Sequence, residues 1–183
     1  MTSLPAVRCT RLPGLLDVDL DLRGDSRGWF KESYQQEKLR AAGFPELTFV
    51  QNNVSYNSDA GVTRGVHAEP WWKYVSLACG SAYAAVVDLR RGGAFGQVET
   101  FDLTPSRALL VPPGCGNAFQ TLEPHTVYTY LVTAHWSPSA GYVAVDLFDP
   151  DLGIDWPLGR ARAVLSEKDA GNPPLRSVRP LDP

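Results

Sequence analysis

The segment "VYTYLVT" (residues 127–133) is built from β-branched and aromatic residues and places Tyr128 and Tyr130 on one face of an extended chain. The segment "YAAVVDL" (83–89) alternates in a similar way. Short runs of this kind are typical of half-buried strands. The 16 glycines and 15 prolines of the chain fall between such runs, as they do where many strands are joined by turns. The sequence therefore predicts a mainly β fold.

The spacing of the strand-like runs is typical of a β-sandwich or jelly-roll barrel with short peripheral helices. The segment "KESYQQEKLRAA" (31–42) is rich in helix formers and is followed by Gly43 and Pro45, so we expect a short helix there. The whole chain, 1–183, has the length of one domain. We expect residues 158–183 to form a tail over the barrel with little regular structure. The predicted strands are 15–22, 47–55, 61–67, 72–79, 82–89, 97–103, 107–112, 117–121, 126–133 and 142–147.

Composition excludes several classes of partner. The net charge is −3, and 17 basic residues are scattered among 20 acidic ones, so the chain lacks the basic stripe that binds nucleic acid or anionic lipid. The N-terminus has no continuous apolar stretch, and no window reaches the roughly 18 apolar residues that span a membrane. Three widely separated cysteines without C-x-x-C spacing favour a reducing compartment. We therefore expect a cytoplasmic protein with a neutral or small anionic ligand.

The segment "GVTRGVHAEPWWKYVSLACG" (61–80) contains one of only three histidines. A lone histidine in a strand is usually a structural residue whose hydrogen bonds are satisfied. Arg64 and His67 are three positions apart, so they point to opposite faces unless a bulge intervenes. Lys73 follows a turn that contains proline and can return beside His67. With a tyrosine from 126–133, these side chains would supply a base, a cation and an acid to one pocket.

Metal and nucleophilic catalysis find no support in the motifs. A metal centre in a β-barrel of this type needs several histidines on one wall, and the chain has no H-x-H. His125 in "LEPHT" and His135 in "TAHWSP" are expected to be exposed polar residues. The chain also has no G-x-S-x-G elbow, no histidine in a recognisable signature with Cys79 or Cys115, and no phosphate-binding glycine loop. We expect no metal and no cofactor.

Eight motifs in order carry a resemblance that covers nearly the whole chain. They are "GDSRGWFKESY" (24–34), "FVQNNVSYN" (49–57), the 61–80 segment, "VVDLRRGGAFGQ" (86–97), "LLVPPGCGNAFQTL" (109–122), "YTYLVTAHWSP" (128–138), "DPDLGIDWP" (149–157) and "LSEKDAGNP" (165–173). In these motifs the chain resembles the dTDP-4-dehydrorhamnose 3,5-epimerase family of the cupin superfamily. The resemblance implies a jelly-roll fold, a homodimer with exchanged N-terminal strands, and no metal. It also implies inversion of C3 and C5 of dTDP-4-dehydro-6-deoxy-D-glucose, giving dTDP-4-dehydro-L-rhamnose through an enolate.

The resemblance also implies four catalytic roles. His67 resembles the base, and Asp169 resembles the aspartate that orients it; we expect Asp169 to accept the Nδ1 proton and leave Nε2 free. Tyr130 resembles the general acid on the opposite face of the sugar. Lys73 resembles the cation at the keto oxygen, where a fixed charge stabilises an enolate. Without the resemblance, Tyr130 reads as an ordinary strand tyrosine and Asp169 as a solvated carboxylate.

The same resemblance implies a set of substrate-binding residues. Arginine suits the diphosphate because its planar fork meets two phosphate oxygens at once. Trp136 either stacks on the thymine or packs in the core, and Lys168 makes a substrate or dimer contact. The set comprises Arg27, Glu32, Gln51, Asn53, Arg64, Asn117, Trp136 and Lys168.

Two positions depart from the commonest pattern of the family. Many relatives have a histidine where this chain has Asn117 and an aspartate where it has Ala84. Asn117 can still donate a hydrogen bond to an enolate oxygen, but it carries no charge. These departures leave open a single-carbon 3- or 5-epimerase of an antibiotic deoxysugar pathway. A second alternative is a cupin that binds a sugar nucleotide without catalysis, and the retention of the four catalytic residues argues against it.

Overall fold

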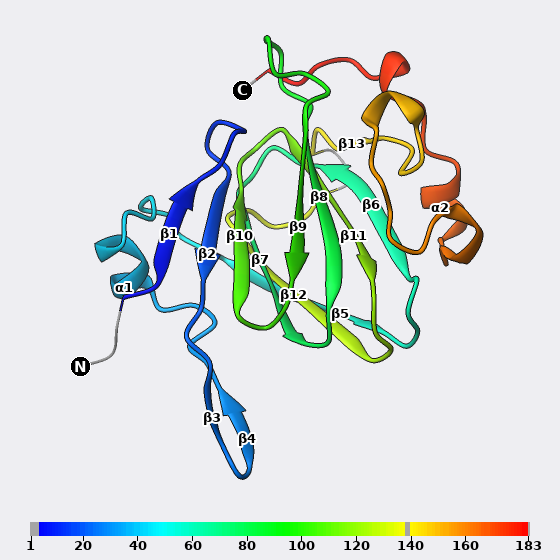
Figure 1. Ribbon diagram of the computed structural model, residues 1–183. Coiled ribbons are helices and arrows are strands. Elements are labelled where there is room, and N and C mark those ends of the chain that lie inside the picture. The colour runs from blue at the N-terminus through cyan, green and yellow to red at the C-terminus, as the bar shows by residue number, and fades with distance from the viewer. Residues whose placement is uncertain (1–3, 138–139, 183) are drawn as a thin grey trace.

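The computed structural model describes residues 4–137 and 140–182. Two antiparallel sheets face each other and form a jelly-roll barrel (Figure 1). The six-stranded sheet has the order β1 (Ala6–Cys9), β2 (Leu16–Asp19), β10 (Arg107–Val111), β7 (Lys73–Cys79), β12 (Thr126–Val132), β5 (Gln51–Asn57). The five-stranded sheet has the order β13 (Val143–Ala144), β6 (Thr63–Ala68), β11 (Cys115–Thr121), β8 (Ala82–Asp88), β9 (Val98–Leu103). The predicted mainly β jelly-roll is confirmed.

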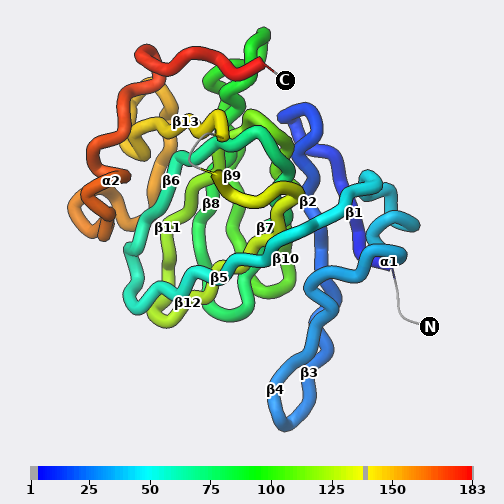
Figure 2. The backbone as a smooth tube through the Cα atoms, turned by 180° about the vertical axis from the view of Figure 1, so that it is seen from behind, coloured from blue at the N-terminus to red at the C-terminus, as the bar shows by residue number. Residues whose placement is uncertain are grey.

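Every predicted strand range overlaps a strand, although 142–147 overlaps one of only two residues. Three strands were not predicted: β1 near the N-terminus, and the hairpin of β3 (Arg23–Asp25) and β4 (Gly28–Phe30). All six residues of β3 and β4 are exposed, so the alternation that marks a half-buried strand is missing there. The hairpin projects away from the barrel in both views of the chain (Figures 1 and 2).

The inner faces of the two sheets pack an apolar core. Leu77 of β7, Leu109 of β10 and Phe119 of β11 belong to this cluster and are almost completely buried. A second apolar cluster lies on the outer face of the six-stranded sheet, where Leu39 and Phe44 cover Tyr74. Burial of each large side chain contributes roughly 1.5–3 kcal/mol. Because alternate residues of β7 belong to the two clusters, both faces of this strand are buried.

The helix α1 (Gln36–Ala41) is shorter than the predicted 31–42. Residues 31–35 are held against the outer face of the six-stranded sheet instead: the Lys31 ammonium donates to the carbonyls of Leu77 at 2.6 Å and Pro105 at 2.9 Å. The helix begins after Gln35, whose side chain accepts from the amide of Lys38 at 2.6 Å. Tertiary contacts therefore override the helix propensity of the first five residues.

The C-terminal segment, residues 158–182, lies against the outer face of the five-stranded sheet (Figure 2). It contains η2 (Arg160–Arg162), the helical turn α2 (Glu167–Ala170) and η3 (Leu175–Ser177); η1 (Pro150–Leu152) precedes it. Leu175 is buried in the cluster that covers this face. In the described part of the chain, no helix is both long and apolar enough to cross a membrane.

Candidate active site

A cavity of about 520 Å³ lies between the two sheets. The six-stranded sheet contributes lining residues from β5, β7 and β12. The five-stranded sheet contributes lining residues from β6 and β11, and α2 adds one carboxylate. Polar and aromatic side chains therefore replace the apolar core in this part of the barrel. The lining residues are Val54, Ser55, Tyr56, Arg64, His67, Glu69, Lys73, Asn117, Phe119, Tyr128, Tyr130 and Asp169.

A bulge in β6 places Arg64 and His67 at the same cavity. Asn117 of β11 pairs with His67, and Phe119 pairs with Arg64, so three steps along β6 oppose two along β11. Gly65 in the bulge has φ +116°, and a Cβ there would lie 2.6 Å from the carbonyl oxygen of Asn117. Glycine is therefore required at this position. The sequence predicts that Arg64 and His67 reach one cavity only if a bulge intervenes, and the structure contains this bulge.

His67 and Asp169 form a hydrogen-bonded pair on the cavity wall. The distance between His67 Nε2 and Asp169 Oδ1 is 2.7 Å. The prediction that Nδ1 faces Asp169 is wrong, because the carboxylate approaches from α2 and meets Nε2, the ring nitrogen farther from the main chain. With Nε2 donating to the carboxylate, Nδ1 is the nitrogen left to accept a proton.

The helical turn α2 fixes the position of Asp169. The Ser166 hydroxyl caps the turn by accepting from the Asp169 amide at 3.1 Å. Two residues beyond the turn, the Asn172 side chain donates to the carbonyl of Gly65 at 3.3 Å, which ties the segment to the bulge of β6. The aspartate side chain is consequently buried, with 6 % of its surface exposed.

Burial lowers the pKa of His67 below its ordinary value, while the charge of Asp169 and the hydrogen bond to it oppose that shift. A lowered pKa keeps the imidazole neutral near pH 7, which is the state that a general base requires. The Tyr142 ring packs beside the imidazole, with 5.3 Å between ring centroids. This contact completes the partly apolar surroundings of the base.

Lys73 begins β7 and directs its ammonium to the same wall. Nζ donates to the carbonyl oxygen of His67 at 3.0 Å and to the Glu69 carboxylate. The prediction that the chain returns Lys73 beside His67 after the turn is confirmed. A charged donor therefore stands next to the candidate base.

Tyr128 and Tyr130 both face the cavity from β12, as their spacing predicts. Tyr128 is buried, stacks on Phe119 with centroids 4.1 Å apart, and accepts a hydrogen bond from the Asn117 side chain at 3.2 Å. Tyr130 is less buried, and desolvation raises its pKa, with a further contribution from the charge of Glu69. A phenol with a raised pKa stays protonated and can serve as a general acid.

The predicted phosphate ligand Arg64 is held by one side of its guanidinium. Its Nε donates to the Asn57 side chain at 3.0 Å, and Asn57 is itself buried and fixed by donating to the carbonyls of Ser55 and Thr126. No described residue hydrogen-bonds to the terminal nitrogens of Arg64, so they are available to a ligand in the cavity. Asn57 is a positioning residue that the sequence analysis did not single out.

Gln51 and Asn53 lie on β5 and hydrogen-bond to each other at 2.8 Å. Asn53 pairs directly with Tyr130 across the sheet, so both amides extend the inner face beyond the lining of the cavity. Trp136 is exposed and stands outside that lining. Lys168 is also outside it, with Nζ 4.6 Å from the centroid of the Tyr142 ring.

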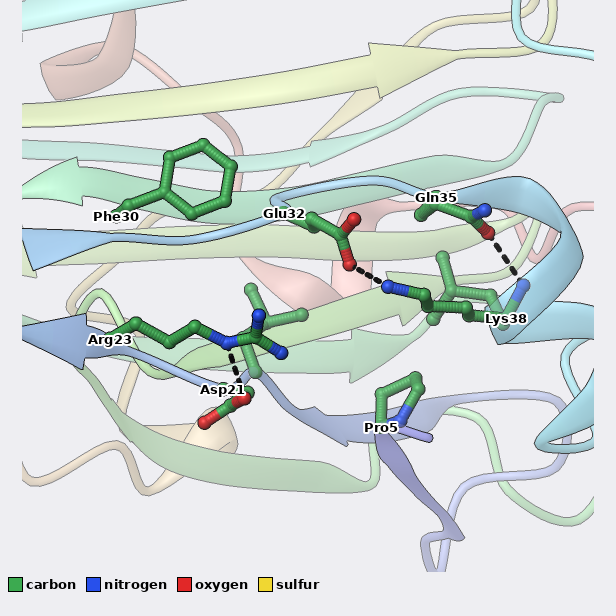
Figure 3. A pocket seen from close by; sticks show the side chains of 9 residues that line it. Pro5, Asp21, Arg23, Phe30, Glu32, Gln35 and Lys38 are labelled. Carbon is green, nitrogen blue, oxygen red and sulfur yellow. Dashed lines mark hydrogen bonds and ion pairs between the residues drawn. The ribbon is translucent and has the colours of Figure 1, made fainter. Parts of the chain in front are cut away.

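Arg27 and Glu32 are not brought to the cavity of their own chain. Arg27 lies between β3 and β4 at the end of the projecting hairpin, where it pairs with Asp25. Glu32 lines a separate, small pocket between the N-terminal strands and α1, where it forms an ion pair with Lys38 (Figure 3). Both residues therefore lie apart from the cavity lining in this chain.

The two departures from the family pattern lie on one face of the five-stranded sheet. Asn117 pairs with Val86, and Ala84 pairs with Phe119, which makes Ala84 and Asn117 diagonal neighbours. Ala84 is buried in the apolar core. A histidine and an aspartate at these positions would therefore be within reach of each other, and here an amide and a methyl group stand in their place.

His125 and His135 are exposed, as predicted. The His125 ring is hydrogen-bonded to the Tyr56 hydroxyl at 2.5 Å. Within residues 4–137 and 140–182, no three side chains of histidine, cysteine, aspartate or glutamate are grouped so that they could hold a metal ion.

Glu69 is a charged residue of the cavity lining that was not among the predicted site residues. A signal was present, because Glu69 precedes Lys73 by only four positions across the Pro70 turn that joins β6 to β7, and so short a connection keeps the two residues close together. The family resemblance implies the keto oxygen of the substrate as the partner of Lys73. The structure shows that the protein supplies one as well.

The protein is a jelly roll whose cavity is lined by an imidazole, an ammonium and a phenol. These are the functional groups of an enzyme that transfers protons to and from its substrate. The model of the family "dTDP-4-dehydrorhamnose 3,5-epimerase" matches residues 9–177. A protein RmlC homolog of Streptococcus pyogenes serotype M6 is 46% identical, over 94% of this chain and 90% of the relative. The dTDP-4-dehydrorhamnose 3,5-epimerase of Pseudomonas aeruginosa is 36% identical, over 89% and 93%.

A solved structure of RmlC from Streptococcus suis in complex with dTDP-D-xylose superposes with a TM-score of 0.92 at 41% identity, and covers 98% of this chain and 96% of that one. The chain therefore belongs to the dTDP-4-dehydrorhamnose 3,5-epimerase family.

Proposed function

We propose that this protein is an epimerase that inverts C3 and C5 of dTDP-4-dehydro-6-deoxy-D-glucose and yields dTDP-4-dehydro-L-rhamnose. The observation that carries the proposal is the convergence of His67, Lys73 and Tyr130 on one cavity in a member of this family. Both carbons flank the C4 ketone, which makes their protons acidic. The reaction needs a base, a stabiliser of the enolate and an acid, and no cofactor.

His67 is the base in this proposal. Neutral near pH 7, it takes a proton from carbon through Nδ1 while Nε2 keeps its hydrogen bond to Asp169. The imidazolium that forms is stabilised by the buried carboxylate. Asp169 is a positioning residue because it acts through His67.

Lys73 stabilises the enolate. As the proton leaves, negative charge develops on the C4 oxygen, and a preorganised ammonium in a cavity with little water lowers the energy of that state. Lys73 also touches the main chain of His67, so base and cation are fixed relative to each other. The enolate oxygen and the departing proton thus meet groups on the same wall.

Tyr130 donates its own phenolic proton to the carbon on the opposite face, and exchange with solvent then restores neutral His67 and the protonated phenol. His67 belongs to β6 of the five-stranded sheet and Tyr130 to β12 of the six-stranded sheet, so a sugar between the sheets lies between the two residues. Removal of a proton on one face and delivery on the other inverts the carbon. A base and an acid on opposite walls distinguish an epimerase from a protein that only binds the nucleotide sugar.

The nucleotide is held by the mouth of the cavity. Arg64 takes the diphosphate through its free terminal nitrogens. Asn117 donates to a sugar or enolate oxygen, and Gln51 and Asn53 line the path to the base. Trp136 stacks on the thymine at the exposed rim, and Lys168 adds a positive charge beside Tyr142.

We also propose a homodimer in which the N-terminal hairpins are exchanged, so that Arg27 and Glu32 complete the cavity of the other subunit. The support is the hairpin itself: it projects from the barrel and exposes Trp29 and Phe30, which is typical of a contact surface (Figure 1). A cytoplasmic location is part of the proposal; Cys9, Cys79 and Cys115 are free thiols, as a reducing compartment keeps them.

The test of the exchange is complementation between two inactive variants. Arg27→Ala lacks a hairpin ligand, and His67→Asn lacks the base. Mixed after dissociation, they form heterodimers in which one cavity has the intact His67 of one chain and the intact Arg27 of the other. Random pairing should restore about a quarter of the wild-type activity. No recovery on mixing, with heterodimers present, would contradict the exchange.

The test of the reaction is incubation with dTDP-4-dehydro-6-deoxyglucose in D2O, followed by NMR of the product. Deuterium at both C3 and C5 with inverted configuration is the expected result. Deuterium at one carbon only would establish the single-carbon epimerase that Asn117 and Ala84 leave open. Binding without any exchange would overturn the catalytic proposal.

A further inference from the structure

The Lys73 ammonium is buried in the cavity wall beside a second charged side chain. Its side chain is 4 % exposed, and that of its partner Glu69 is 13 % exposed. Nζ donates to the Glu69 carboxylate and to the carbonyl oxygen of His67. The two residues stand four positions apart on either side of the turn at Pro70, so the ion pair also closes that turn.

An ammonium carries three N–H donors. Two of those of Lys73 are taken by Glu69 and His67, and no other residue in the described part of the chain accepts the third. Both Lys73 and Glu69 line the cavity. The arrangement therefore leaves one donor for an oxygen atom of the ligand.

A buried ammonium without a counter-ion gives up its proton, because desolvation disfavours the charged form. Glu69 supplies the counter-ion. We propose that Glu69 is a positioning residue of the reaction, which keeps Lys73 charged and holds it with one N–H directed at the oxygen where the enolate charge develops. This inference rests on the proposed epimerase function.

Charge balance in the cavity supports the assignment. Two carboxylates, Asp169 and Glu69, face two cations, Lys73 and Arg64. When the base takes a proton, the imidazolium adds one positive charge and the enolate adds one negative charge, so the sum stays unchanged. Without Glu69 the cavity would carry an excess positive charge before the substrate arrives.

The charge of Glu69 also reaches the acid and the base. It raises the pKa of Tyr130 in addition to desolvation, and it raises that of His67 against the larger lowering effect of burial. Removal of this charge should therefore lower the pH at which each of these groups titrates. The titratable and charged groups that face Lys73 and Glu69 from the surrounding elements are Arg64, His67, Cys115, Tyr128, Tyr130, Tyr142 and Asp169.

The experiment compares Glu69→Gln, which keeps the shape and one acceptor oxygen, with Lys73→Met and with the double variant. Loss of an enolate donor in Lys73→Met should lower kcat by roughly 10²–10³-fold. Glu69→Gln should lower kcat by at least about tenfold and move both limbs of the pH profile to lower pH. In the Lys73→Met background, Glu69→Gln should have no further effect on the pH-independent value of kcat. Independent, multiplicative losses or an unchanged pH profile would overturn the proposal.

Two further variants separate positioning from folding. Glu69→Asp keeps the charge but withdraws it by one methylene, so kcat should fall while the limbs of the pH profile stay near their wild-type positions; an unchanged kcat would overturn the positioning role. Asp17→Asn is the matched control, because Asp17 is a buried carboxylate paired with Arg107 away from the cavity. It should lower the melting temperature without moving the pH profile.

A measurement without substrate separates this inference from the proposed function. The chain has four lysines, Lys31, Lys38, Lys73 and Lys168, so NMR of the ¹³Cε groups can resolve each one. The ¹³Cε chemical shift of Lys73 should change in Glu69→Gln and stay unchanged in Asp17→Asn, whatever the turnover. A wild type without turnover would overturn the epimerase proposal alone, whereas an unchanged Lys73 signal in Glu69→Gln would overturn the role of Glu69 alone.

Discussion

Substitution of Asp169 by asparagine tests the pair on which the base depends. The change removes the negative charge 2.7 Å from His67 Nε2 and leaves the side chain nearly isosteric. The charge and hydrogen bond of Asp169 raise the pKa of His67 against the effect of burial. Without them, only the charge of Glu69 opposes the lowering effect of burial, so the pKa of His67 falls further. The neutral base is then present at lower pH, so the acid limb of the pH profile should move to lower pH.

The size of the effect follows from the geometry. Two unit charges about 4 Å apart interact by about 4 kcal/mol at an effective dielectric constant of about 20. Opposite charges at this range shift a pKa by about one to three units, so the acid limb should move by a similar amount. A base with a lower pKa is also a weaker base, and loss of a positioning partner lowers activity by about 10- to 100-fold. The variant should therefore be slow and active at lower pH.

The assay is kcat against pH, with ¹H–¹⁵N NMR of His67 as a direct titration. Asp149→Asn is a suitable control, because Asp149 is a buried carboxylate that accepts from the amides of Asp151 and Leu175 outside the cavity. It should reduce stability and leave the pH profile in place. An Asp169→Asn enzyme with the wild-type rate and acid limb would refute the pairing as a feature of the mechanism.

Three other outcomes are expected. Tyr130→Phe should still exchange the C3 and C5 protons with solvent but deliver deuterium in the original configuration; equal loss of exchange and inversion would show that Tyr130 is not the acid. Exhaustive dialysis against a chelator should leave turnover unchanged, and recovery with a divalent ion after loss would contradict the cofactor-free mechanism. Gly65→Ala should lower the free energy of unfolding by about 1–3 kcal/mol or more in a denaturant titration, because its φ of +116° is unfavourable for alanine and its Cβ would meet the Asn117 carbonyl. An alanine variant of wild-type stability would show that the bulge relaxes without glycine.

The strands of the barrel could be predicted because burial of one face leaves alternation in the sequence. β12 and β8 are the clearest cases, since their side chains divide between the core and a second layer. The hairpin of β3 and β4 lacks that signal because all of its residues are exposed in the single chain. Residues 31–35 look helical by composition, but the Lys31 ammonium fixes them across two carbonyls of the sheet. Such contacts between distant segments leave no periodic pattern in the amino-acid sequence.

In the site, too, the residue types could be predicted from the sequence, but the directions of the side chains depend on how the strands pair. The residue types in "GVTRGVHAEPWWK" indicate a base beside a cation, but a regular strand would turn Arg64 and His67 to opposite faces. The pairing with β11 decides which way the two side chains point. Two residue steps along β11 pair with three along β6, and this bulge brings both side chains to the cavity. The same register leaves Gly65 no room for a side chain and places its carbonyl within reach of Asn172. The bulge therefore does more than align two ligands: through Asn172 it also anchors the segment that carries Asp169, so the arginine, the base and its aspartate depend on one irregularity of one strand.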